Sequence, residues 1–109
     1  MKLQEIADKL ELERLTPVFD KDVTGVYISD MVSDVIANAK AGNLLVTVQV
    51  HANALAAANL VDVCGIVVAQ GKKPADDVIK MAEKAEIPVF TTSLSRWQVA
   101  TQLYEAGIR

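Results

Sequence analysis

The sequence predicts an α/β domain in which helices cover both faces of a mainly parallel sheet. Residues 44–46 and 66–68 are continuous apolar runs, which are typical of strands buried on both faces. Each run is followed by a segment with apolar residues at helical spacing. Because strands that alternate with helices favour a parallel sheet between two helix layers, we expect a three-layer α/β/α sandwich.

The first third of the chain fits this alternation less cleanly. Residues 2–10 predict a short amphipathic helix, with the i, i+3, i+4, i+7 stripe Leu3, Ile6, Ala7 and Leu10. A short extended piece is expected at residues 12–15, and a loop then runs from Thr16-Pro17 to Asp20-Lys21-Asp22. Residues 23–29 are rich in β-branched and aromatic residues and predict a strand. The sheet can therefore be mixed, with an antiparallel strand added by this region.

The remaining elements alternate regularly. A helix is expected to begin at Ser29 or Asp30 as the cap and to stop at Gly42, with the apolar stripe Met31, Val32, Val35, Ile36 and Ala39. Further strands are predicted at residues 44–50, 65–69 and 88–91. Further helices are predicted at about residues 53–62, 75–85 and 94–106, the second of them opened by Pro74 at the first helical position.

The composition predicts a single compact domain over residues 1–109, since 51% of the residues are hydrophobic and 23% are charged. The net charge of −3 and the lack of a basic face disfavour nucleic acid as a partner. The first ten residues lack the apolar core of a signal peptide, and no apolar run reaches membrane-spanning length. We therefore expect a cytoplasmic protein with no membrane partner.

The chain carries few groups for metal binding or catalysis. Cys64 is its only cysteine, which excludes an internal disulfide and a four-thiolate zinc or iron-sulfur site within one chain. The common nucleotide-binding, zinc-protease and serine-hydrolase motifs are absent. His51 is the only histidine, and the carboxylates mostly fall on predicted helix surfaces or turns. We assign no metal ligand, cofactor or catalytic residue, and an enzyme is the least favoured class.

Polar residues gather where the predicted parallel strands end, which is where open α/β sheets bind ligands. Several of them open helices, whose free amides favour anions, so we expect a small polar or phosphorylated ligand there. The candidate ligand-binding residues are Asp30, Gln49, His51, Asn53, Gln70, Gly71, Thr91, Thr92 and Ser93.

Structural roles compete with ligand binding at these residues. Asp30, Asn53 and Ser93 are also suitable N-caps, and His51 is also interpreted as a hydrogen-bonded or solvent-facing residue. Gln49 and Gln70 favour a polar network within the subunit or across a dimer, and residues 71–74 favour an exposed turn. Cys64 is expected in the core, and Trp97 is expected to anchor packing or an interface.

The predicted helix at residues 53–62 is apolar around most of its circumference. A domain of this size has little interior with which to cover such a helix. We therefore expect a homo-oligomer, and a twofold dimer in particular. The alternative is that the helix is buried wholly within one subunit.

Three stretches, residues 22–58, 65–74 and 87–108, together resemble the DRTGG domain family over essentially the full chain. The name-giving motif is present as Asp22-Val23-Thr24-Gly25-Val26, in which Asp22, Thr24 and Gly25 match the family. Val23 and Val26 stand where Arg and a second Gly are usual. The motif therefore lacks the positive charge of the Arg, and it lacks the second Gly that would let a charged ligand come close to the backbone. We expect Thr24-Gly25 to form a bulge or sharp bend that aims Ser29-Asp30 at the sheet edge.

The resemblance implies a fold similar to the amino-terminal domain of HPr kinase/phosphorylase. Domains of this family occur inside phosphotransacetylases and between CBS modules of regulated pyrophosphatases, as non-catalytic, dimer-forming or regulatory modules. The resemblance thus implies a regulatory or interaction module that homodimerises, senses a small ligand and acts on a partner enzyme. The alternative is a binding protein for a nucleotide or phosphorylated metabolite. Stand-alone members have names linked to iron-sulfur hydrogenases, so an accessory role there is a less favoured third interpretation.

Overall fold

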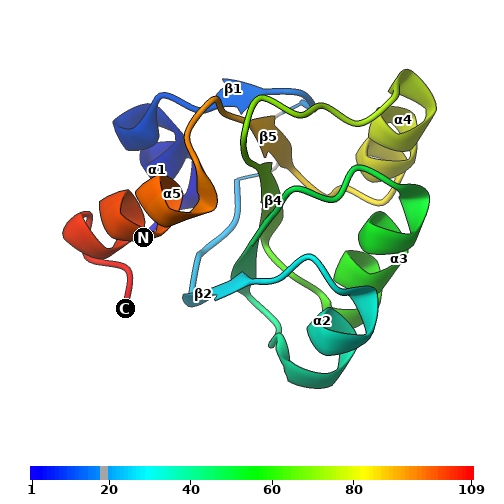
Figure 1. Cartoon of the computed structure of the whole chain (residues 1–109), viewed down its shortest axis with the longest axis horizontal. Coiled ribbons are helices and arrows are strands. Elements are labelled where there is room, and N and C mark those ends of the chain that lie inside the picture. Colours follow the sequence, from blue (N-terminus) through cyan, green and yellow to red (C-terminus); the bar gives the residue numbers. More distant parts are fainter. Residues whose placement is uncertain (18–19) are drawn as a thin grey trace.

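The computed structural model describes residues 1–17 and 20–109, and the part of the predicted loop at residues 18–19 lies outside the described residues. Within these two segments the chain forms five helices and a five-stranded sheet (Figure 1). The strands are β1 (Glu13–Arg14), β2 (Gly25–Ile28), β3 (Asn43–Thr47), β4 (Gly65–Val68) and β5 (Val89–Thr91). The helices are α1 (Leu3–Leu10), α2 (Val32–Asn38), α3 (Ala52–Val61), α4 (Asp76–Lys84) and α5 (Arg96–Glu105). None of the described helices is long and apolar enough to cross a membrane.

The strands lie in the order β1-β5-β4-β3-β2. Strands β2 to β5 are parallel, whereas β1 pairs antiparallel with β5, with Glu13 opposite Thr91 and Arg14 opposite Phe90. The predicted α/β class and the antiparallel addition from the first third of the chain are both confirmed. Because β2 to β5 are parallel, their carboxyl ends share one edge of the sheet, which we call the carboxyl edge.

Helices cover both faces of the sheet, with α2, α3 and α4 on one face and α1 and α5 on the other (Figure 1). The side chains of β3 alternate between these layers. Leu44 and Val46 belong to the core cluster under α1 and α5, while Leu45 belongs to the cluster under α2, α3 and α4. Burial on both faces explains why the strands read as continuous apolar runs.

The chain order explains this division of the helices. From β2 to β5 each strand is placed beside the previous one in the same direction, and right-handed crossovers then put α2, α3 and α4 on one face. Only α5, which follows β5, crosses to the other face, where it joins α1 (Figure 1). The start of α5 therefore approaches the carboxyl edge from the side opposite to α2 and α3.

The predicted helix ends at Gly42 and Ser93 were wrong. Helix α2 ends at Asn38, because the backbone amide of Lys40 donates to the side chain of Asn43 and closes a turn before β3. Helix α5 begins two residues later than predicted, since its N-cap is Ser95 and not Ser93.

Ser95 and Gln98 form a capping box, a stronger start signal than an isolated serine. The position of Pro74 was also predicted wrongly. It lies two residues before α4, whose N-cap is Ala75. Strand β3 ends at Thr47, three residues earlier than expected, where the chain turns toward α3.

Helix α3 lies between α2 and α4 in its layer (Figure 1). These neighbours and the sheet bury Leu55, Ala57 and Ala58, while Leu60 stays 71% exposed. Helix α3 is therefore covered only in part within one subunit, since Ala56 and Leu60 stay exposed. The homodimer stays a prediction.

The predicted bulge at Thr24-Gly25 was wrong. Pairing runs without interruption from Gly25 opposite Asn43 to Ile28 opposite Val46. Gly25 is buried, and a Cβ at this position would lie 3.1 Å from Nδ2 of Asn43. A side chain here would press on the side chain of Asn43, which holds the turn at Lys40.

Candidate functional site

Asp30 follows β2 and connects three elements at the carboxyl edge. Its carboxylate accepts hydrogen bonds from the backbone amide of Val48, at 2.8 Å, and from the hydroxyl of Thr47, at 3.0 Å. It also accepts one from the guanidinium of Arg96, the first residue of α5. The side chains of Asp30 and Arg96 are only partly exposed, at 30% and 39%. One carboxylate thus holds the ends of β2 and β3 and the start of α5 together.

Arg96 is a residue of this cluster that the sequence analysis missed. A cation in the first turn of a helix opposes the helix dipole, whose amino-terminal end is positive. An arginine at that position therefore needs an acceptor from elsewhere in the fold, and this is the signal that could have drawn attention to it. Asp30 supplies the acceptor.

Asp30 does not cap α2, so that interpretation was wrong. The N-cap is Met31, and the Met31 amide donates to the hydroxyl of Ser29 at 3.2 Å. Asp34 lies in the first turn of α2, and hydrogen bonds from Ser29, Tyr27 and Asn38 lower the pKa of its carboxyl. The bond from Tyr27 to Asp34, at 2.8 Å, raises the pKa of the Tyr27 hydroxyl. These bonds fix the first turn of α2 beside Asp30.

Gln49, His51 and Asn53 lie around the start of α3. His51 is the N-cap and is exposed, with no capping bond from its side chain, and Asn53 is exposed within the first turn. The predicted N-cap role of Asn53 was therefore wrong. Gln49 is half-buried. The solvent-facing interpretation of His51 is confirmed.

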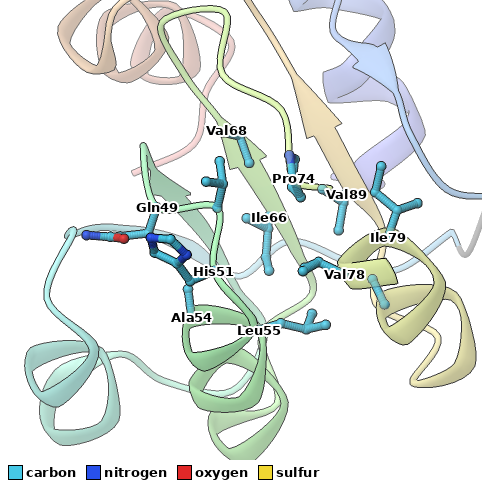
Figure 2. A pocket seen from close by; sticks show the side chains of 12 residues that line it. Gln49, His51, Ala54, Leu55, Ile66, Val68, Pro74, Val78, Ile79 and Val89 are labelled. Atoms are coloured by element: carbon cyan, nitrogen blue, oxygen red, sulfur yellow. The ribbon is translucent and has the colours of Figure 1, made fainter. Parts of the chain in front are cut away.

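Below these residues an apolar pocket separates α3 from α4. Figure 2 shows Gln49 and His51 at one side of it and Val78 and Ile79 of α4 at the other. Its cavity volume is about 20 Å³. This is room for about one water molecule, so a ligand cannot enter unless the two helices separate.

A larger hollow lies at the carboxyl end of β5, with a volume of about 300 Å³. Four of the predicted site residues line it: Gly71, Thr91, Thr92 and Ser93. Lys73 and two glutamates near β1, Glu11 and Glu13, complete the lining. We call this the β5 hollow. Its volume lies at the lower end of the range for small-molecule sites.

Hydrogen bonds shape the wall of the β5 hollow. The Thr91 hydroxyl donates to the carbonyl of Lys72 at 2.6 Å, and the Thr92 hydroxyl accepts from the amide of Leu94 at 3.2 Å. The Gly71 amide donates to the carbonyl of Thr92 at 2.8 Å. These bonds position Ser93, which is exposed at the rim.

Charge in the β5 hollow comes from a single ion pair and one further carboxylate. The ammonium of Lys73 lies 2.7 Å from a carboxylate oxygen of Glu13, and both side chains are more than half exposed, at 55% and 57%. Ion pairs with this exposure are weak, so an anion can compete for the lysine. Gly71, at φ 69°, leaves open space beside its backbone. The turn predicted at residues 71–74 lies earlier, at residues 69–72, where the Lys72 amide donates to the carbonyl of Ala69 at 3.3 Å.

Gln70 takes part neither in the contacts around Asp30 nor in the lining of the β5 hollow. Gln70 is exposed and has a φ of 62°, so the burial assumed for its amide is absent in the subunit. A network of Gln49 and Gln70 across a dimer stays a prediction.

The motif residues lie at the amino end of β2, at the edge of the sheet opposite to Asp30. The Thr24 hydroxyl donates to the carbonyl of Ala41 at 3.4 Å, and exposed Asp22 pairs with Lys2 at 3.4 Å. The motif therefore supports the amino-terminal edge of the sheet and does not contribute to the carboxyl edge.

Cys64 and Trp97 are separate from both clusters. Cys64 is buried, as predicted, and burial raises the pKa of its thiol to about 11. Trp97 is 75% exposed, so it does not anchor packing within the subunit, and an interface role stays a prediction. Across the two described segments, no group of three or more His, Cys, Asp or Glu side chains could hold a metal ion.

The fold and the carboxyl edge define a small three-layer α/β/α domain with polar side chains gathered where its parallel strands end. The chain belongs to the DRTGG domain family, whose model matches residues 5–106. No curated protein matches the sequence.

Among solved structures, the chain is similar to the CBS and DRTGG domains of the regulatory region of Clostridium perfringens pyrophosphatase, in complex with its activator diadenosine tetraphosphate. The TM-score is 0.73 with 19% sequence identity, over 93% of this chain and 45% of that one. The chain thus spans less than half the length of this relative. At this identity the similarity shows the fold.

Proposed function

We propose that this chain is a non-catalytic regulatory module that binds a nucleotide or phosphorylated metabolite at the carboxyl edge and works as a homodimer on a partner enzyme. The observation that carries the ligand proposal is the β5 hollow of about 300 Å³, which four residues expected at strand ends line together. The similar DRTGG region of the pyrophosphatase is regulatory and was solved with a nucleotide activator, which supports the same class of ligand.

The chemistry of the β5 hollow fits a phosphorylated ligand that also has a neutral polar part. The Lys73 ammonium and the Ser93 hydroxyl can donate to phosphate oxygens. Glu11 and Glu13 would repel an isolated phosphate, but they can accept from ribose hydroxyls or from base amino groups. This combination favours a nucleotide over inorganic phosphate.

The position of the hollow gives the ligand a route to a structural response. Thr92 and Ser93 line the hollow, and three residues after Ser93 the chain reaches Arg96, which contacts Asp30. A ligand that moves Ser93 therefore acts on the start of α5. A regulatory output through α5 follows from this connection.

The described side chains give little support for catalysis. His51 is exposed at the start of α3 and does not line the β5 hollow. The Asp30 carboxylate already accepts three hydrogen bonds, so it is a poor general base. An accessory role beside an iron-sulfur hydrogenase is the weaker alternative. The chain has a single cysteine, Cys64, and its thiol is buried, so the chain cannot supply the thiolates that an iron-sulfur cluster needs.

A thermal-shift panel of nucleotides and phosphorylated metabolites tests the proposal. A ligand present at 100 times its dissociation constant stabilises the folded state by about 2.7 kcal/mol. Lys73→Gln should weaken this shift, whereas Lys72→Gln should leave it unchanged, because Lys72 is exposed and its side chain does not line the hollow.

If no compound at millimolar concentration shifts the melting temperature, ligand binding is contradicted. Turnover of any panel compound that is lost in His51→Ala or Asp30→Ala would contradict the non-catalytic part of the proposal.

A further inference from the structure

Strand β2 forms one edge of the sheet, and no strand of the described segments pairs with its outer side (Figure 1). At the end of β2 the Ser29 amide donates to the carbonyl of Val46, so the backbone of Ser29 faces β3. Because successive residues of a strand direct their backbone groups to opposite sides, Val26 and Ile28 direct theirs away from the sheet. Each of them therefore offers an amide and a carbonyl to a further strand.

The register of β2 supports these directions. In a parallel ladder an amide donates to the residue before its own partner, and Val46 pairs with Ile28, the residue before Ser29. The Thr24 amide donates instead to Gly42, which continues the register directly opposite Thr24. That bond lies before the regular ladder begins, so the alternation of backbone groups applies within β2.

The two edges of the sheet differ in their protection against further pairing. Edge strands of soluble proteins are usually short or charged, because an open edge pairs with other chains. Strand β1 at the opposite edge follows this rule, since it consists only of Glu13 and Arg14, which are both exposed. Strand β2 has four residues, Gly-Val-Tyr-Ile, and none of them is charged. The edge at β2 is therefore open to pairing.

A groove lies beside this open edge, between β2 and the helix α5 with the residues that follow it. Its volume is about 510 Å³. Ile28 on one side of the groove is 42% exposed, and Tyr104 on the other side is 61% exposed. We call this surface the β2 groove. Its apolar lining consists of Val26, Ile28, Ala100, Leu103, Tyr104 and Ile108.

We infer that the edge of β2 and the β2 groove bind an extended segment of the partner enzyme, which adds one strand to the five-stranded sheet. The backbone of the segment pairs with Val26 and Ile28, and every second side chain enters the groove. In strand addition, main-chain hydrogen bonds give affinity and pockets for alternate side chains give specificity. This deepens the proposed function, on whose partner enzyme it rests, by naming the surface that the enzyme contacts.

Arg109 indicates an acidic residue in the bound segment. It lines the β2 groove, and its guanidinium lies 3.9 Å from the centroid of the Tyr104 ring and donates to the Tyr104 carbonyl. None of the ion pairs among the described residues involves Arg109. A carboxylate of the segment can therefore pair with it. We expect a segment with alternating apolar residues and an Asp or Glu beside them.

A second copy of this chain fits the β2 groove less well than a free segment does. In a pair of β2 strands, the side chains of Val26 and Ile28 already line the groove of their own copy. Pairing would set the two grooves side by side and leave both unfilled. A segment with no helix packed over it can instead place long apolar side chains between Ile28 and Tyr104.

Proline variants test the direction of the backbone groups without a bound segment. Proline is tolerated within a sheet where its missing amide would point away from the ladder. Ile28→Pro should therefore stay folded by circular dichroism, whereas Tyr27→Pro should lower the melting temperature much further because it removes a bond to β3. In the free chain, the amides of Val26 and Ile28 should exchange with deuterium faster than the amide of Tyr27.

Peptides selected on the full chain from a random library displayed on phage serve as the probe. The enriched sequences should alternate apolar residues and include an acidic one. The dissociation constant of the strongest peptide should be at least about tenfold higher for Ile28→Pro than for Ile28→Ala, which lacks the side chain but keeps the amide. Binding should also slow deuterium exchange at the amides of Val26 and Ile28.

Two aromatic residues of α5 form a matched pair for the groove. Tyr104→Ala should weaken peptide binding, because Tyr104 lines the β2 groove. Trp97→Ala should leave it unchanged, because Trp97 is 75% exposed on the same helix but does not line this groove. Equal effects of the two variants would place the peptide outside the β2 groove.

The outcomes separate this inference from the proposed function. Strand addition is overturned if no peptide is enriched, or if the peptides bind Ile28→Pro and Ile28→Ala equally. Slow exchange at Val26 and Ile28 that depends on the concentration of the free chain would assign the edge to a second copy, and it would overturn the partner segment. Ligand binding is judged separately by the thermal-shift panel, so it stands or falls independently of these results.

Discussion

Arg96 donates a hydrogen bond to Asp30, which precedes it by 66 residues, and this contact joins the two helix layers at the carboxyl edge. Asp30 stands before α2 in one layer, and Arg96 begins α5 in the other. Since Asp30 also holds Thr47 and Val48 at the end of β3, its carboxylate has more partners than the guanidinium. The two residues should therefore contribute unequally to stability.

We predict that Asp30→Ala lowers the free energy of unfolding by about 2–3 kcal/mol, because the Val48 amide and the Thr47 hydroxyl lose a charged acceptor. Arg96→Ala should cost less than about 1 kcal/mol, as is usual for a partly exposed ion pair. Urea unfolding of both variants measures the difference. Equal losses would show that the ion pair, and not the bonds to β3, dominates at Asp30.

Gly42 and Gly71 form a matched pair for a second prediction. Both have positive φ, 83° and 69°, but a Cβ at Gly42 would lie 2.5 Å from Oγ1 of Thr24, while nothing lies within 4 Å at Gly71. Gly71→Ala should therefore cost only the backbone strain, about 1 kcal/mol. Gly42→Ala should cost about 2–3 kcal/mol, because overpacking adds to the strain.

The double variant Thr24→Ala/Gly42→Ala separates the two costs, because it removes the contacting Oγ1 atom. Its unfolding free energy should recover part of the loss seen in Gly42→Ala. Without any recovery, the steric contact between the family motif and the turn before β3 would not be the cause.

Cys64 gives a prediction that depends on pH. The pKa of the folded thiol is about 11, raised by burial from the ordinary value of 9.0. The folded state therefore favours the protonated thiol. Its stabilising contribution is complete below about pH 9 and is lost as the pH rises from 9.0 toward 11.

The unfolding free energy of the native chain relative to Cys64→Ala should thus fall between pH 8 and pH 10.5, as measured by urea unfolding. At pH 8 an aromatic disulfide reagent should react slowly with the folded chain and rapidly in denaturant. Rapid labelling of the folded chain would contradict the burial of this thiol.

The sequence predicts much of this fold because burial on both faces leaves a clear pattern. The runs around Leu45 and Val67 are apolar without interruption, since each neighbouring residue meets one of the two helix layers. The antiparallel β1 was also predictable as an exception to the alternation. Helix ends were less predictable, because the stop of α2 depends on the bond from Lys40 to Asn43.

The two clusters of the carboxyl edge differ in how far the sequence predicts them. Thr91 ends β5, and Thr92 and Ser93 follow it directly, so their proximity in the β5 hollow was implied by their spacing. The contact of Arg96 with Asp30 was not, because it depends on α5 crossing to the opposite face. Spacing along the chain carries no information on that crossing.

The start of α5 gives a final prediction, which separates structure from ligand binding at two nearby serines. The Ser95 hydroxyl accepts from the Gln98 amide at 3.1 Å, and the Gln98 side chain accepts from the Ser95 amide at 2.9 Å. Ser95→Ala should therefore lower the free energy of unfolding by about 1 kcal/mol. Ser93→Ala should leave it unchanged, since Ser93 is exposed and lies outside the helix.

In the thermal-shift panel the order of the two variants should reverse, because Ser93 lines the β5 hollow and Ser95 does not. If Ser93→Ala instead lost stability and kept its ligand response, Ser93 would be a structural residue and the β5 hollow would not extend to it.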